Sequence, residues 1–177
     1  GVGVLRSLDG KMPKVHPEAF VSESAYIIGD VYIGKWSSIW PGVVIRADAG
    51  KIEIGENTNI QDNSVVHGDA DVHIGNNVVI GHRVMCHAKQ IDDHVLIGNG
   101  ATVNDGVMIG EYSLLASGTV IVDGAKIPPK SLVVGVPGKR LATVKERHIE
   151  LINRTAEHYV NNGKRYKNQG NLEQDTL

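Results

Sequence analysis

Aliphatic residues recur at every sixth position over most of this chain, and this period limits the possible folds more than any other feature of the sequence. A six-residue period fits neither the 3.6 residues of a helical turn nor the two-residue alternation of a flat strand. It is typical of a solenoid of short strands and tight turns, in which three hexapeptides make one triangular coil with the aliphatic residues inside. A sandwich is disfavoured because its strands recur at roughly 8–12 residues without a fixed phase. The regular runs cover residues 15–45, 54–66, 74–86 and 91–133.

The composition fits a narrow, repetitive interior. The 177 residues include 21 Gly and a single Phe, so Val, Ile and Leu must fill the core, and glycine accepts the backbone angles of tight turns. We therefore predict an all-β fold, a left-handed parallel β-helix of hexapeptide repeats with a C-terminal α-helix. Its expected parts are an N-terminal segment at residues 1–14, the β-helix at 15–135, the α-helix at 140–163 and a disordered tail at 168–177.

The C-terminal α-helix is predicted from apolar and amphipathic residues that follow one another at spacings of three and four. This spacing places them on one face, which we expect to pack on one side of the prism. The helix is expected to end near Gly163. The residues at this spacing are Val144, His148, Ile152, Thr155 and Tyr159.

Charge and cysteine content exclude several classes of function. Eighteen Lys and Arg against twenty Asp and Glu give a net charge of −2 and a pI near 6.5 without a basic block, so neither nucleic acid nor a membrane surface is a predicted partner. No apolar run approaches the ~20 residues of a transmembrane helix. The single Cys86 cannot form an internal disulfide. These features predict a cytoplasmic protein.

The six-residue phase slips at three places, and polar residues gather around them. The irregular steps are of nine, eight and five residues and begin at Ile45, Val66 and Cys86. Because these three residues occupy equivalent positions in successive coils, the residues that follow them stack on one edge of the prism. Neighbouring strands lie about 4.8 Å apart, so two imidazoles stacked in this way can share one metal ion. The stacked residues are Arg46, His67 and His87.

His82 stacks with Asp62 on a different edge, since the aliphatic residues before them are equivalent positions one coil apart. In a single prism His82 does not reach the other two histidines. Three prisms around a threefold axis remove this difficulty, because one edge of each subunit then faces another edge of its neighbour. The sequence therefore predicts a homotrimer in which His82 of one subunit completes a metal site with the histidine pair of the next. Arg46 would meet Asp62 across the same contact.

Three imidazoles with an open fourth position are typical of catalytic zinc, whereas structural zinc sites have four protein ligands. Iron(II) or cobalt also binds nitrogen ligands, so the sequence leaves the metal open. A lone histidine is more often a surface or hydrogen-bonded residue than a ligand. The histidines without such an arrangement are interpreted in that way: His16, His73, His94, His148 and His158.

Several segments resemble the γ-class carbonic anhydrases and their close relatives. The resemblance extends over nearly the whole chain, and its most specific part is the histidine spacing combined with an Asn-Ile-Gln-Asp motif. The matching segments are Arg46-Ala47-Asp48, Asn59-Ile60-Gln61-Asp62, Val66-His67-Gly68, Gly81-His82-Arg83-Val84-Met85-Cys86-His87, Pro128-Pro129-Lys130-Ser131-Leu132 and Gly135-Val136-Pro137-Gly138-Lys139.

The resemblance implies a metal-dependent carbonic anhydrase, which hydrates carbon dioxide reversibly to bicarbonate with a metal-bound hydroxide at the trimer interface. His67 and His87 match the metal ligands from one subunit, and His82 matches the ligand from the next. Gln61 matches the residue that hydrogen-bonds the hydroxide. Asn59 matches its polar neighbour.

The resemblance also assigns residues around this centre. Arg46 and Asp62 match an ion pair across the trimer interface, with Asp48 beside them. Tyr159 resembles a tyrosine of the terminal helix that reaches the site in relatives with short loops, although a helix aromatic is more often core packing. The chain departs from the best-characterised members at Ala49, where they carry Glu, and in having only residues 68–71 in place of an acidic loop. Low activity is therefore one expectation.

Two other functions stay open at the level of the sequence. Acyltransferases with an acyl-coenzyme A donor share this solenoid, but they typically use one histidine as a general base and lack a three-histidine set. A non-catalytic trimer that serves as a scaffold or binds a small ligand would keep the metal site without turnover.

Overall fold

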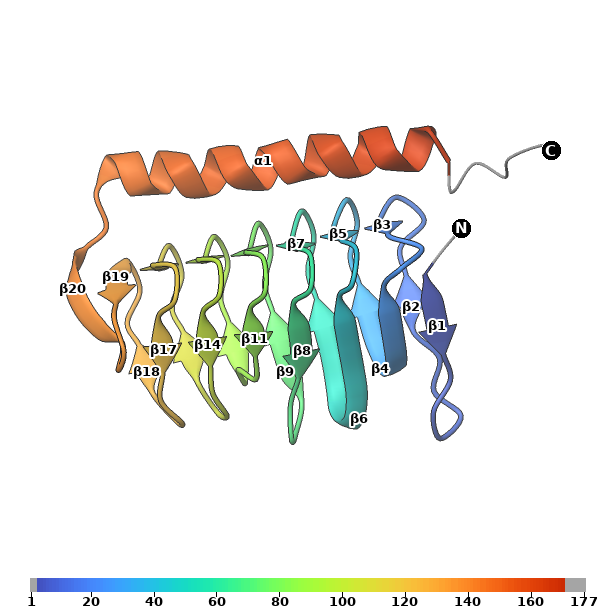
Figure 1. Ribbon diagram of the computed structural model, residues 1–177, viewed down its shortest axis with the longest axis horizontal. Coiled ribbons are helices and arrows are strands. Elements are labelled where there is room, and N and C mark those ends of the chain that lie inside the picture. Colours follow the sequence, from blue (N-terminus) through green and yellow to red (C-terminus); the bar gives the residue numbers. More distant parts are fainter. Residues whose placement is uncertain (1–2, 171–177) are drawn as a thin grey trace.

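The computed structural model describes residues 3–170 and shows a parallel β-helix with one long α-helix along its side (Figure 1). Most strands are short, and the strands of successive coils pair in parallel. These observations confirm the predicted hexapeptide-repeat β-helix.

Three faces make up the prism, and each inward position of the repeat falls on one of them. Face 1 contains β1 (Val4–Arg6), the first parts of β4 (Tyr26–Ile33) and β6 (Val44–Ile54), β8 (Val65–His67), β11 (Met85–Cys86), β14 (Thr102–Val103) and β17 (Val120–Ile121). Face 2 contains β2 (Lys14–Val15), the last parts of β4 and β6, β9 (Val72–Ile74), β12 (Gln90–Ile91), β15 (Met108–Ile109) and β18 (Lys126–Ile127). Face 3 contains β3 (Phe20–Val21), β5 (Ser38–Ile39), β7 (Asn59–Ile60), β10 (Val79–Ile80), β13 (Leu96–Ile97), β16 (Leu114–Leu115) and β19 (Ser131–Val134).

The core is the column of inward residues that the period predicts. On face 1, for example, Ile45 pairs with Val66, and Val66 pairs with Cys86 in the next coil. All three are fully buried. Stacking like side chains on like side chains fills the interior with few residue types, which explains how the chain folds with one Phe.

The outward residues distinguish the three faces. Those of face 1 are mainly apolar: Val4, Tyr26, Val44, Val65, Met85, Thr102 and Val120. Those of face 2 are mainly polar or charged: Lys14, Tyr32, Glu53, His73, Gln90, Met108 and Lys126. Face 3 is covered by α1 (Glu146–Asn168), which contacts β3, β5, β7 and β10.

The C-terminal helix differs from the prediction at both ends. It begins at Glu146 rather than at residue 140, because β20 (Lys139–Thr143) turns back and pairs antiparallel with β19. It continues past Gly163 to Asn168. Gly163 does not end the helix but lets it approach face 3, since a Cβ there would lie 3.2 Å from the Cβ of Ser38.

The N-terminal segment also differs from the prediction of a separate part at residues 1–14. Strand β1 pairs with β4 and places Leu5 beside Ile27, so the solenoid starts ahead of residue 15. A turn closed by a bridge between Leu8 and Lys11 breaks the period here and hides this start in the sequence. Residues 171–177 of the predicted tail lie outside the described residues. None of the helices within residues 3–170 is long and apolar enough to span a membrane.

Candidate metal centre

All three phase slips fall at one corner of the prism, between face 1 and face 2. The long strand β6 and the turn between β8 and β9 project from this corner (Figure 1). Arg46 pairs with His67 in the strand register, and His87 follows one coil later. The stacking deduced from the six-residue period is therefore present. We call this corner, defined by His67 and His87, the histidine-pair corner.

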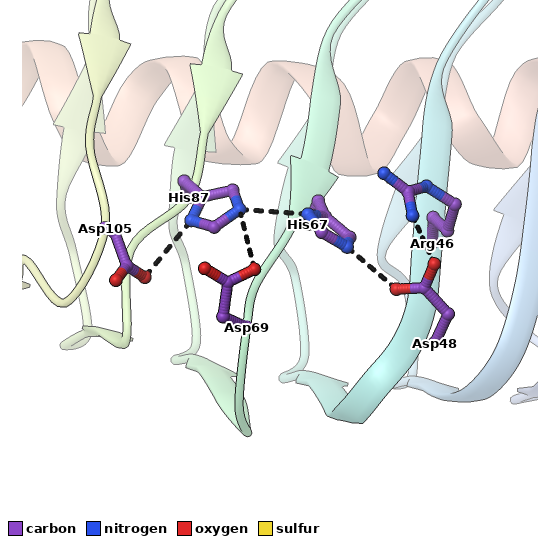
Figure 2. A network of polar contacts seen from close by, with 6 residues as sticks. All are labelled: Arg46, Asp48, His67, Asp69, His87 and Asp105. Atoms are coloured by element: carbon purple, nitrogen blue, oxygen red, sulfur yellow. Dashed lines mark hydrogen bonds and ion pairs between the residues drawn. The ribbon is translucent and has the colours of Figure 1, made fainter.

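One ring nitrogen of each imidazole in this corner, the inner one, points toward the other ring, and the second, outer nitrogen of each contacts a carboxylate (Figure 2). Nδ1 of His67 lies 2.9 Å from Nε2 of His87. Nε2 of His67 lies 2.8 Å from Oδ1 of Asp48, and Nδ1 of His87 lies 3.2 Å from Oδ1 of Asp105. The histidine side chains are only 16% and 19% exposed, so both rings are held at the surface of the prism rather than in free solvent.

The donor set of this corner fits a metal ion. An ionised carboxylate only accepts hydrogen bonds, so each outer nitrogen carries the ring proton and each inner nitrogen of a neutral ring carries a lone pair. Two lone pairs facing each other at 2.9 Å repel unless a proton or a metal ion lies between them. Two nitrogen ligands of one tetrahedral zinc ion are roughly 3.3 Å apart. A small movement of the rings therefore converts the observed pair into two ligands of one ion.

A further carboxylate lies on the inner side of the pair. Oδ1 of Asp69 is 3.8 Å from Nε2 of His87, and ligand atoms of His67, Asp69 and His87 all lie within 4.8 Å of one another. Asp69 is mostly exposed, on the short turn between β8 and β9. It is thus a solvent-facing acid on the side of the rings where an ion would bind.

Asp48 is kept ionised by its neighbours. The hydrogen bond from His67 lowers the pKa of Asp48, and contact with the Arg46 guanidinium lowers it further. Within one chain Arg46 therefore pairs with Asp48 rather than with Asp62. Asp62 instead lies 3.0 Å from Nδ1 of His82. An Arg46–Asp62 pair between subunits stays a prediction.

His82 lies at the corner between face 3 and face 1, which we call the His82 corner. His82 precedes strand β11, whereas His87 follows it. His82 and Arg83 form the turn at one edge of face 1, whereas His87 lies at the other edge, so the width of the face separates the two histidines. One chain therefore cannot place His82 and His87 around the same ion, as the stacking in the sequence predicts.

The remaining predicted residues gather beside His82. A groove of about 240 Å³ is lined by Gln61, His82 and Tyr159 together with apolar residues of face 3. Gln61 is only 4% exposed, and its Nε2 donates to Oδ1 of Asn59 at 2.9 Å. Tyr159 comes from α1, and burial raises the pKa of its hydroxyl, with the negative charge of Asp62 adding to this effect. Tyr159 also packs edge to face on Trp40, so it contributes to the packing of the helix as well.

Sequence reasoning missed Asp105 and the apolar exterior of face 1. Asp105 lies in the turn after β14, one coil beyond His87, because Cys86 pairs with Val103. The same stacking arithmetic that grouped the histidines would have located it. The outward residue of each strand is the one directly before the inward residue in the sequence. The apolar exterior of face 1 could therefore have been predicted from these positions.

Comparison with known proteins relates this chain to a family. The bacterial transferase hexapeptide family (six repeats) matches residues 89–123. Gamma carbonic anhydrase 1, mitochondrial, of Arabidopsis thaliana is 39% identical over 165 residues, which cover 89% of this chain and 60% of that protein. The probable carbonic anhydrase of Methanocaldococcus jannaschii is 42% identical over 142 residues, which cover 79% of this chain and 89% of that protein.

A solved structure shows the same fold at similar sequence identity. The hexapeptide transferase family protein from Anaplasma phagocytophilum superposes with a TM-score of 0.88 and 40% identity, over 92% of this chain and 98% of that one. The chain spans about three fifths of the length of the Arabidopsis relatives it matches.

Proposed function

The chain belongs to the γ-carbonic-anhydrase-like family of hexapeptide-repeat proteins, and we propose that it is a metal-dependent carbonic anhydrase, which interconverts carbon dioxide and bicarbonate. The observation that carries this proposal is the pair of facing nitrogens of His67 and His87, 2.9 Å apart, with both outer nitrogens committed to carboxylates. This pair supplies two of the three imidazoles that such a centre requires.

The third imidazole is proposed to come from a neighbouring subunit in a homotrimer. The histidine-pair corner and the His82 corner border the same face of the prism, face 1, on its two sides. Face 1 is the face whose exterior is apolar and which no other part of residues 3–170 covers, and Val65 on it is 38% exposed. Packing three copies of face 1 around a threefold axis covers these side chains and brings the two corners of adjacent subunits together.

In this arrangement His67 and His87 of one subunit and His82 of the next would hold zinc, with iron(II) or cobalt as other ions that suit nitrogen ligands. When bound, an ion with three neutral imidazole ligands lowers the pKa of water to about 7 and so provides a strong nucleophile at neutral pH. Asp48 is hydrogen-bonded to His67, and Asp62 lies 3.0 Å from Nδ1 of His82, so each of these rings already has a carboxylate partner.

Other residues of the chain would bind and orient the substrate and accept the released proton. The amide of Gln61, fixed by Asn59, lies in the groove beside His82 and is placed to orient a reacting oxygen. The apolar wall of that groove, which includes Val79 and Leu96, suits a nonpolar substrate such as carbon dioxide. Oδ1 of Asp69 is the acceptor that we assign to the released proton, because it is both close to Nε2 of His87 and open to solvent.

The test is carbon dioxide hydration by the purified full chain after loading with zinc, iron(II) or cobalt, compared with the same protein treated with a chelator. The proposal predicts hydration that depends on the metal and that is lost in His67→Ala. Hydration at the rate of buffer alone with every metal, in a protein whose bound metal is confirmed by elemental analysis, would contradict it. That outcome would favour the scaffold without turnover.

An acyltransferase is the second candidate, because the hexapeptide family match and the Anaplasma protein carry transferase names. The matched residues 89–123 lie beyond all three histidines of the proposed site, so this match supports the coil and not the centre. Stabilisation against heat by coenzyme A, with no response to metal, would favour this function. The cytoplasmic location stays a prediction, and the name of the Arabidopsis relative places that protein in mitochondria.

A further inference from the structure

His87 has a hydrogen-bond partner on the side of its ring that faces away from His67. Nδ1 of His87 lies 3.2 Å from Oδ1 of Asp105, which the turn between β14 and β15 supplies from the next coil (Figure 2). The Asp105 side chain is 58% exposed, while that of His87 is 19% exposed. The aspartate therefore approaches the ring from solvent and leaves Nε2 directed toward His67.

His67 makes the same kind of hydrogen bond, and His82 has an aspartate at a similar distance. Asp48 contacts one ring nitrogen of His67 at 2.8 Å, and Asp62 contacts one ring nitrogen of His82 at 3.0 Å. Histidines that bind metals almost always donate the N–H of the second ring nitrogen to a carboxylate, a carbonyl or water. One aspartate for each of the three histidines is therefore a pattern that separates this set from chance surface contacts.

We infer that Asp105 is a positioning residue of the metal centre. By accepting the Nδ1 proton of His87, it selects the neutral tautomer whose lone pair is on Nε2, the nitrogen that faces Nδ1 of His67. It also fixes the rotation of the ring about its bond to the chain. The inference rests on the proposed function only in requiring that the histidine pair bind a metal.

Asp69 makes a different contact with the same ring. It approaches Nε2 of His87, at 3.8 Å, on the side where the ion would bind. Asp105 contacts Nδ1, on the opposite side of the ring, and is therefore not a ligand of an ion bound at Nε2. Substitution of Asp105 should therefore change how strongly the metal is held without removing a ligand.

The test compares Asp105→Ala and Asp105→Asn with a matched control. Asp123 occupies the same place in the turn one coil later, because Val103 pairs with Ile121, and it is exposed. Asp123→Ala thus removes an equivalent turn carboxylate that does not touch a histidine of the site. Two quantities are measured: the zinc dissociation constant by competition with a chelator, and the tautomer of His87 in metal-free protein by 15N NMR of labelled histidine.

The inference predicts that Asp105→Ala weakens zinc binding by about 10–100-fold, the range typical of an outer carboxylate partner. Asp105→Asn should weaken it less, since its side-chain oxygen still accepts the hydrogen bond. The metal-free wild type should show His87 protonated at Nδ1, and Asp105→Ala should shift that population. Asp123→Ala should match the wild type in both measurements.

Zinc binding by Asp105→Ala within about twofold of the wild type would overturn the inference. So would a His87 tautomer that does not change on this substitution. These results are distinguishable from failure of the proposed function. A protein that binds zinc less tightly without Asp105, yet never hydrates carbon dioxide, would retain the positioning role and lose the carbonic anhydrase. If neither the wild type nor any variant binds metal, the inference is overturned together with the proposed function, because Asp105 then has no metal centre to position.

Discussion

Face 1 and face 2 of the prism have the same kind of interior but different exteriors. Both stack buried aliphatic residues at every inward position, such as Ile45 on face 1 and Ile54 on face 2. The outward neighbour of Ile45 is Val44, whereas that of Ile54 is Glu53. The inward residues therefore determine the coil, and the outward residues distinguish face 1, the proposed subunit interface, from face 2. Residues of the proposed three-histidine set lie at both edges of face 1 but at only one edge of face 2.

The largest effect is expected when face 1 is given the exterior of face 2. Val65→Asp places a carboxylate at the centre of the proposed interface, where an unpaired buried charge costs several kcal/mol. The dissociation constant of the trimer should rise at least about 100-fold, measured by light scattering after gel filtration. The control is His73→Asp, on face 2 of the same coil, which should remain trimeric. Equal behaviour of the two variants would remove the distinction between the faces.

The contribution of the edges of face 1 to metal binding is tested by replacing His82 while the apolar exterior of face 1 stays unchanged. His82→Ala should remain trimeric but bind zinc roughly 100-fold or more weakly, since losing a ligand exceeds the 10–100-fold effect of an outer partner. Elemental analysis and chelator competition measure the loss, and hydration of carbon dioxide should fall with it. His73→Ala, an exposed histidine of face 2, serves as the control. Full zinc content in the His82→Ala trimer would contradict a site shared between subunits.

Face 3 is the case in which the cover comes from the same chain. A Cβ at Gly163 would lie 3.2 Å from Ser38 and 3.5 Å from Phe20, so the branched side chain of Gly163→Val has no space. Overpacking of this kind lowers the free energy of unfolding by about 1–3 kcal/mol. Denaturant unfolding at fixed protein concentration measures it, with Asn161→Val on the exposed side of α1 as the control. A change no larger than that of the control would show that α1 is not held closely on face 3.

The smallest effect concerns the shared interior. Burial raises the pKa of the Cys86 thiol to about 11 from 9.0. The unfolded thiol ionises first as the pH rises, so the contribution of this thiol to stability is fully present below pH 9 and is lost through pH 11. The free energy of unfolding should fall by about 1 kcal/mol more in the wild type than in Cys86→Val between pH 7 and pH 10. Val fits this column because Val66 and Val103 flank Cys86. Parallel pH profiles of the two proteins would indicate that the thiol is not shielded.

The six-residue period correctly predicted the features that follow from the repeated inward side chain. It gave wrong or missing predictions where antiparallel pairing or helix packing determines the structure. The inward aliphatic residues located the coils and the stacked histidine pair, because register in a parallel β-helix follows directly from counting. Strand β20 was missed since it pairs antiparallel outside the repeat. Gly163 was misread because its role is the close approach of α1 to face 3, which only the packed structure reveals.

The positions of the candidate site residues in the repeat could be predicted, but the contacts between their side chains could not. Counting placed Arg46, His67 and His87 on one edge and His82 on another, but it did not show which ring nitrogen faces which carboxylate. Those contacts depend on side-chain rotamers. Asp105 required one further step of the same counting. The contact between subunits depends on a surface that a single chain leaves exposed, so it remains a proposal supported by the apolar exterior of face 1.

The most direct test of the shared centre is metal content in mixed trimers of His82→Ala and His87→Ala subunits. Each parent trimer lacks one ligand at every site. Each site combines the histidine pair of one subunit with His82 of the next subunit around the threefold axis. In a mixed trimer, a subunit that keeps His87 meets a subunit that keeps His82 at one of the three contacts, which restores one site. The account predicts about one zinc ion per mixed trimer and none in either parent trimer at the same free zinc. Mixed trimers as empty as their parents would contradict a centre built from two subunits.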